Sequence, residues 1–193
     1  IYIMANRLGS SSMFKPDIKL FDTHDIHRKD YDKYNVTSTE EIECDTIENS
    51  LNELNIRNLD YLKIDTQGSE LQILKGLGAY RPSLIKLEAH IFSMYEGVPS
   101  WNEILTLLYK LNYVLVDWKG IGKHNTRVPA EIDLIFVPNF NNSEGINFIK
   151  KNENKIISLL LIFGQINLLK IILKNIDSNS TNIINNLNDK YFD

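Results

Sequence analysis

The stretch that most constrains the fold is Asp60–Gly76, which reads DYLKIDTQGSELQILKG. It opens with a short apolar run that stops at Asp65 and has the length and composition of a buried strand. Gly68 then permits a tight turn or a close backbone approach. Ser69 and Gln72 match the capping box that opens a helix, and leucines recur behind them at helical spacing. The stretch therefore predicts a strand, a tight turn and a helix in succession.

A second apolar run, Leu84–Glu88, also ends at an acidic residue, and His90 follows two positions later. Strands that alternate with helices favour parallel βαβ units. Ligands of open α/β sheets bind outside the carboxyl ends of the strands. We therefore expect Leu62–Asp65 and Leu84–Glu88 to be adjacent interior strands of a parallel sheet, with their acidic ends and His90 along one rim. The alternative for Asp65 is a plain turn-capping role.

The remaining patterns extend this α/β interpretation. The last two expected strands are separated by Gly120–Pro129, which is too short for a crossover helix, so they should pair antiparallel. Strands are expected at Ile1–Ala5, Glu40–Cys44, Tyr113–Val116 and Ile132–Val137, and helices at about 45–55 and 100–111.

Charge and cysteine content restrict the class of protein. A net charge of −4 gives no support for a nucleic-acid partner, which calls for a basic face. The single cysteine, Cys44, cannot form an internal disulfide, so a reducing, cytoplasmic location is the default. A buried or strand-end thiol is the expected environment for Cys44.

The composition changes after residue 140, where Asn, Ile and Lys dominate. The apolar stretch 152–175 is interrupted by Gly164 and Lys170 within the roughly 20 residues that a membrane span needs, so no transmembrane span is expected. One or two helices should pack on the domain, or on a partner or second copy through residues 155–174. We divide the chain into a main domain, 1–140, and a helical appendage and tail, 141–193.

The central stretch also resembles a known family. The pattern D-x-x-K-x-D-x-x-G-x-E-x-x-x-L-x-G is similar to the signature of the FkbM-type methyltransferases, which use S-adenosylmethionine. Further family-like motifs follow in order, so that the resemblance covers about residues 1 to 140. The signature is filled by Asp60, Lys63, Asp65, Gly68, Glu70, Leu74 and Gly76, and the flanking motifs are Ser10–Ser12, Leu87–His90, Met94–Gly97, Asn112-Tyr113 and Glu131–Val137.

The resemblance implies a Rossmann-like class I methyltransferase sheet with an antiparallel terminal hairpin. It also implies O-methylation of a hydroxyl on a sugar, glycan or small-molecule acceptor. The family carries a glycine-rich cofactor loop early in the domain, but the nearest glycine pair here, Gly120 and Gly122, lies in a late loop. We therefore expect a chain truncated at the N-terminus and inactive by itself. The alternative is a degenerate, non-catalytic half-domain that acts as an interaction module.

Methyl transfer to a hydroxyl requires positioning of the reactants and removal of the acceptor's proton. His90 is the natural base because its ordinary pKa lies near neutrality, although a structural histidine is equally compatible. Asp65 is expected to orient the cofactor's sulfonium or amino group, and Glu88 the acceptor. Gly68 and Glu70 are further candidates for cofactor binding, although Glu is favourable in any first helical turn.

Other residues have two open uses. Ser11, Ser12, Tyr95 and Trp101 are candidate acceptor contacts, although the aromatic pair would serve equally well in the core. Mg²⁺ is a competing use of the carboxylates, but we do not expect it because no Asp-Asn pair follows Glu88. Hydrolysis by Asp65, Glu88 and His90 lacks a nucleophile motif. Two polar segments are expected to be solvated: His24 with His27, whose spacing would also suit a metal, and the basic loop with Lys119, Lys123, His124 and Arg127.

Overall fold

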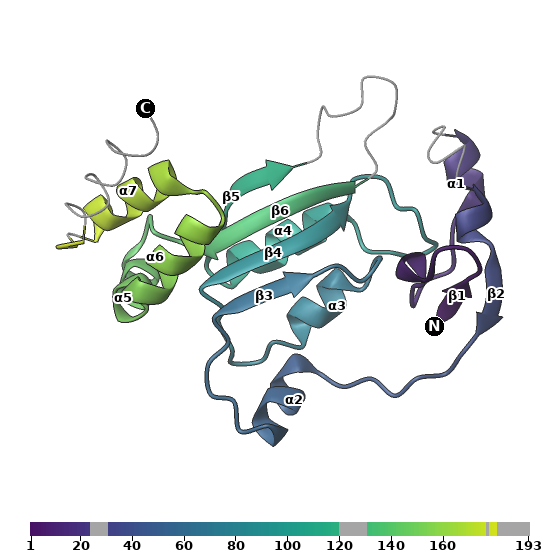
Figure 1. Cartoon of the computed structure of the whole chain (residues 1–193), viewed down its shortest axis with the longest axis horizontal. Coiled ribbons are helices and arrows are strands. Elements are labelled where there is room, and N and C mark those ends of the chain that lie inside the picture. Colours follow the sequence, from purple (N-terminus) through teal and green to yellow (C-terminus); the bar gives the residue numbers. More distant parts are fainter. Residues whose placement is uncertain (24–30, 120–130, 177, 181–193) are drawn as a thin grey trace.

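A computed structural model describes residues 1–23, 31–119, 131–176 and 178–180 of the chain (Figure 1). In these residues the main sheet has four strands in the order β3-β4-β6-β5. A separate two-stranded sheet pairs β1 with β2 near the N-terminus. The strands are β1 (Tyr2–Met4), β2 (Val36–Thr39), β3 (Tyr61–Ile64), β4 (Leu84–His90), β5 (Tyr113–Lys119) and β6 (Glu131–Pro138).

The sheet confirms the expected pairing of the two strands but not their expected interior position. β3 and β4 are parallel neighbours, with Tyr61 opposite Leu84 and Ile64 opposite Leu87. β4 is interior, but β3 is an edge strand because no other described strand pairs with it. β6 lies between β4 and β5 and is antiparallel to both, as the short connection predicted. The result is a mixed α/β sheet that fits a methyltransferase-like fold. The carboxyl ends of β3 and β4 point toward the small β1–β2 sheet (Figure 1).

Helices cover one face of the sheet and part of the other. On one face, α3 (Glu70–Lys75) and α4 (Trp101–Lys110) pack on the inward residues of β3, β4 and β6. On the opposite face, α5 (Ser143–Lys151), α6 (Glu153–Ile162) and α7 (Ile166–Asn175) bury one end of the sheet (Figure 1). The rest of that face carries ionisable side chains of alternate strand residues, which include Lys63, Lys86, Glu88, His90, Glu131 and Asp133.

The remaining helical elements lie in the N-terminal third of the chain. The helix expected at about 45–55 is present as α2 (Ile47–Glu53), and Thr46 caps it by accepting a hydrogen bond from the Asn49 N–H at 3.1 Å. Pro16 to Tyr34 contributes α1 (Ile18–Thr23) and a 3₁₀ turn, η2 (Tyr31–Tyr34), and a second such turn is η1 (Leu8–Ser10). Met4, Phe21, Tyr34, Met94 and Tyr95 form a small separate core there.

Three local expectations are wrong. Glu40–Cys44 forms no strand, because its potential partner β1 begins at Tyr2 and the pairing with β2 already ends near Glu40. Cys44 is consequently exposed rather than buried or at a strand end. Ser69 stands at the start of α3 but its side chain makes no capping hydrogen bond, because its backbone (φ −90°, ψ 8°) lacks the extended conformation of an N-cap residue.

The apolar stretch 152–175 forms two helices, α6 and α7, as expected, and α5 precedes them. The division of the chain at residue 140 stays a prediction. None of the described helices is long and apolar enough to cross a membrane. His24, His27, Lys123, His124, Arg127 and the tail beyond residue 180 lie outside the described residues.

Candidate functional site

The turn after β3 has an unusual backbone. Gln67 has a φ of 56° and Gly68 a φ of 113°, both in the left-handed region that side chains disfavour. A Cβ atom at Gly68 would lie 2.6 Å from Cγ2 of Val98 and 3.2 Å from the Phe14 ring. Glycine is therefore required at position 68 by both backbone angle and space, as the sequence indicated.

A buried carboxylate organises this turn from within. Glu70 is only 3% exposed. Its Oε1 accepts hydrogen bonds from the Thr66 N–H and hydroxyl, both at 3.0 Å, and from the Gly68 N–H at 3.1 Å. Glu70 thus positions the turn, and its expected contact with a cofactor stays a prediction.

Gln67 links three parts of the chain. Its Nε2 donates to Glu88 Oε1 at 3.1 Å, and its Oε1 lies 2.9 Å from the Tyr95 hydroxyl. Its backbone oxygen accepts a 2.6 Å hydrogen bond from the Ser12 hydroxyl. Sequence reasoning missed Gln67, and the only available signal was its place between Asp65 and Gly68. Its left-handed backbone is thus held by contacts with the N-terminal segment and with β4.

Glu88, His90 and Glu131 form the main cluster of ionisable side chains at this end of the sheet. Glu88 and His90 are on the same face of β4, and Glu131 of β6 is the direct cross-strand neighbour of His90. One ligand atom from each residue lies within 4.8 Å of the other two. His90 is 6% exposed and stacks on Tyr95, with ring centroids 5.7 Å apart and planes 19° apart. Glu131 was missed as a site residue because it lies far from Glu88 and His90 in the sequence.

The cluster concentrates negative charge where water is partly excluded. Burial, together with the nearby carboxylates of Glu131, Asp65 and Asp133, raises the pKa of the Glu88 carboxyl to about 7. Burial also raises the pKa of Glu131, although the Arg7 guanidinium opposes that shift. The arrangement therefore suits a group that brings positive charge or takes up a proton.

Asp65 lies at the same end of the sheet but is more open to solvent. It follows β3 directly, so it is placed beside the Glu88 position of the neighbouring strand. Its Oδ2 accepts a 2.6 Å hydrogen bond from Lys63 Nζ, in a surface ion pair. The structure thus brings Asp65, Glu88 and His90 together at one rim, as expected from the parallel strands. Asp65 remains accessible to a ligand.

The expected acceptor contacts are mostly occupied by the fold itself. Ser12 is 1% exposed and accepts the Phe14 N–H at 3.0 Å, while Ser11 Oγ accepts the Met4 N–H at 3.2 Å. Tyr95 is buried, and Trp101 packs against the core beneath α4. A role in acceptor binding for Ser11, Ser12, Tyr95 and Trp101 stays a prediction.

An apolar hollow of about 690 Å³ adjoins the turn at Thr66 and Ser69. This size falls within the range of about 300–1,000 Å³ that is usual for small-molecule sites. Its walls come from the N-terminal segment, the chain before α2, and α3. Lining residues include Ser11, Ser12, Met13, Phe14, Ile42, Cys44, Thr66, Ser69 and Ile73.

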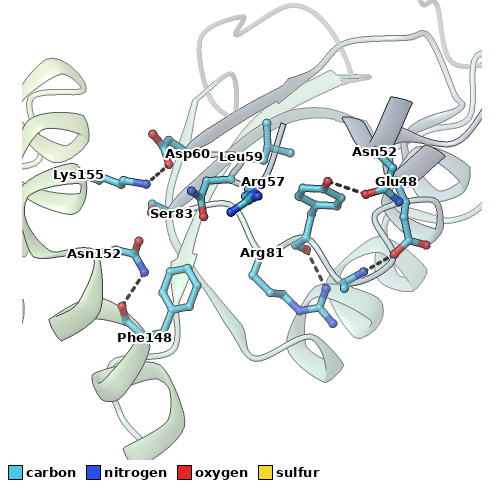
Figure 2. Close-up of a pocket in the computed structure, with 13 residues that line it drawn as sticks. Glu48, Asn52, Arg57, Leu59, Asp60, Arg81, Ser83, Phe148, Asn152 and Lys155 are labelled. Atoms are coloured by element: carbon cyan, nitrogen blue, oxygen red, sulfur yellow. Dashed lines mark hydrogen bonds and ion pairs between the residues drawn. The ribbon is translucent and has the colours of Figure 1, made fainter. Parts of the chain in front are cut away.

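A second pocket, of about 420 Å³, lies at the opposite end of the sheet, where β3 and β4 begin (Figure 2). Several of its polar groups bind one another: Lys155 Nζ is 2.6 Å from Asp60 Oδ1, and Arg81 donates to the Tyr80 carbonyl at 2.8 Å (Figure 2). Ligands of α/β sheets bind at the carboxyl ends of the strands. We therefore place the functional site at the turn and cluster rather than in this pocket.

Comparison with known proteins identifies the family of the chain. The family model of the methyltransferase FkbM domain matches residues 6–115, more than half of the 193 residues. The chain belongs to the FkbM methyltransferase family. No curated protein and no solved structure matches the chain. The FkbM match includes the Gln67 turn, Glu88 and His90, whereas Glu131 and helices α5–α7 lie beyond its end.

Proposed function

We propose that this FkbM-family protein methylates a hydroxyl group of a sugar or other small-molecule acceptor, with S-adenosylmethionine as the methyl donor. The single observation that carries the proposal is the cluster of Glu88, His90 and Glu131 at the carboxyl end of β4, of which Glu88 and His90 lie within the residues that the FkbM model matches. An acceptor at this rim would meet a proton-accepting group.

S-adenosylmethionine would supply an electrophilic methyl group: as the acceptor oxygen bonds to the methyl carbon, the carbon–sulfur bond breaks and its electron pair stays on sulfur as a thioether. The chemistry of the rim fits the cationic end of this cofactor, since Asp65 and Glu88 are carboxylates at neighbouring strand ends. The adjoining hollow has the volume of a ligand site. The glycine-rich motif of the adenosine side does not occur in the 193 residues in a strand-to-helix context.

The residues of the chain would divide the work between the two reactants. Asp65, the more accessible carboxylate, would orient the sulfonium or amino group of the cofactor. Glu88, oriented by the Gln67 amide, would position the acceptor hydroxyl. His90 would take the proton that this hydroxyl loses, because it is held rigidly against Tyr95 two residues beyond Glu88.

Residues 1–193 alone are expected to bind S-adenosylmethionine weakly or not at all. The backbone N–H groups of a glycine-rich loop and the helix N-terminus behind it normally supply much of the binding in this kind of fold. Isothermal titration calorimetry on residues 1–193 would measure the affinity. Micromolar binding would contradict the prediction and show that the loop is dispensable.

The proposed activity is tested by methyl transfer from labelled S-adenosylmethionine to a panel of sugars and other hydroxyl-bearing acceptors. The natural protein that contains residues 1–193 is the enzyme to assay, with Asp65→Ala as the matched variant. Asp65→Ala should raise the dissociation constant of the cofactor. Label that appears only on nitrogen or carbon of the acceptors would argue against O-methylation.

A second candidate function is a non-catalytic interaction module. The observation that favours it is the exposure of two large apolar side chains, with Ile162 of α6 75% exposed and Ile171 of α7 53% exposed. Both lie within residues 155–174, where we expected a partner or a second copy. Light scattering would report self-association, and a monomer that transfers methyl groups would leave no support for this alternative.

A further inference from the structure

We propose that Glu88, His90 and Glu131 bind a divalent first-row transition-metal ion. The three side chains supply one imidazole nitrogen and two carboxylate groups from adjacent antiparallel strands. Their donor atoms lie within 4.8 Å of one another. Metal bonds of about 2.0–2.2 Å place neighbouring ligands about 3–3.6 Å apart, so a small rotation of the carboxylates would complete the site.

The sheet fixes the part of the site that has to be rigid. His90 is only 6% exposed to solvent, and its ring stacks on that of Tyr95. Glu88 and Glu131 are only half-buried, which leaves their carboxylates room to move toward an ion. The Gln67 amide donates to Glu88 Oε1 at 3.1 Å, and such outer hydrogen bonds orient the carboxylates of metal sites.

The charge around the three residues favours a cation. The carboxylates of Asp65 and Asp133 make the electrostatic potential at Glu88 more negative. Burial and this potential together disfavour the ionised form of the Glu88 carboxyl. Lys86 Nζ forms an ion pair with Asp133 Oδ2 at 3.2 Å. The positive charge of Arg7, in the N-terminal segment, favours the ionised form of Glu131. A bound divalent ion would neutralise both glutamates at once.

The donor set distinguishes among metals. Mg²⁺ prefers oxygen ligands alone, whereas imidazole combined with carboxylates suits Mn²⁺, Fe²⁺, Co²⁺ or Zn²⁺. Three protein ligands leave open positions, as in catalytic rather than structural metal sites. With the ion bound, an acceptor hydroxyl on it would have a lowered pKa and lose its proton to solvent, and His90 as a ligand would no longer have the direct base role described under the proposed function. This catalytic role rests on the proposed methyl transfer, but the binding of the ion does not.

The test measures the binding of Mn²⁺ to residues 1–193. Binding is monitored through the decrease of the electron paramagnetic resonance signal of free Mn²⁺. A Cys44→Ser background removes the exposed thiol as a competing ligand. One Mn²⁺ should bind per chain with a sub-millimolar dissociation constant. Glu131→Gln and His90→Ala should each raise that constant by at least about tenfold, because even outer-shell losses cost that much. Mg²⁺ should compete weakly.

Asp133→Asn is the matched control, because it removes a carboxylate from the same face of β6 without removing a ligand. It should change the Mn²⁺ dissociation constant far less than Glu131→Gln does. Thermal unfolding of each variant checks that the sheet is intact. Absence of Mn²⁺ binding by the folded chain, or equal effects of Asp133→Asn and Glu131→Gln, would overturn the inference. Neither cofactor nor acceptor is present, so the outcome is independent of whether the methyltransferase proposal holds.

Discussion

Replacing His90 by alanine should lower the kcat of methyl transfer by about 10²–10⁴-fold, the usual contribution of general acid–base catalysis. The natural protein that contains residues 1–193 is the enzyme for this measurement. The affinity for S-adenosylmethionine should change little, because the lost imidazole acts on the acceptor hydroxyl. We expect this loss of kcat because His90 lies at the carboxyl end of β4 and its ring is held against Tyr95.

His90 is also nearly buried, so a loss of packing has to be separated from a loss of chemistry. His90→Gln keeps much of the side-chain volume and hydrogen-bonding capacity but cannot serve as a base near neutral pH. It should therefore be as inactive as His90→Ala while keeping a melting temperature nearer that of the wild type. If the His90→Gln enzyme is fully active, His90 is not the general base. If Mn²⁺ stimulates the wild type but not His90→Ala, the metal role is favoured over the direct base.

The parts of the fold that could be predicted depend on local patterns. The strand, turn and helix of Asp60–Gly76 each have their own sequence signal, and the parallel pairing of β3 with β4 follows from the order of these signals. Antiparallel pairing of β5 with β6 followed from the length of the connection. The parallel pairing of β3 with β4 also allowed Asp65, Glu88 and His90 to be placed together at one rim of the sheet.

The errors and omissions come from backbone conformations and from contacts between residues that are far apart in the sequence. A capping box at Ser69 and Gln72 fits the sequence, but Ser69 has φ −90° and ψ 8° in place of the extended backbone that an N-cap residue needs. The link from Gln67 to Glu88 depends on a left-handed backbone that no propensity favours for glutamine. The approach of Glu131 to His90 depends on strand register, which alternating apolar residues do not fix across a long connection.

Replacing Glu70 by alanine should lower the free energy of unfolding by about 2–4 kcal/mol, because it leaves buried N–H donors of the turn without their acceptor. The donors concerned are the N–H groups of Thr66 and Gly68, which both bind Glu70 Oε1. Glu70→Gln retains one acceptor oxygen and should fall between the alanine variant and the wild type. Urea unfolding followed by circular dichroism measures the difference.

Glu103→Ala is the matched control, since Glu103 also stands in the first turn of a helix. Glu103 accepts the Ser100 N–H at 3.0 Å in an exposed capping box, so its loss should cost only about 0.5–1 kcal/mol. If Glu70→Ala costs no more than Glu103→Ala, the buried carboxylate does not hold the turn. A larger cost would show that the acidic residue of the FkbM-like signature at this position serves first to shape the backbone between β3 and α3. Gln67, and through it Glu88, would then depend on Glu70 for their placement.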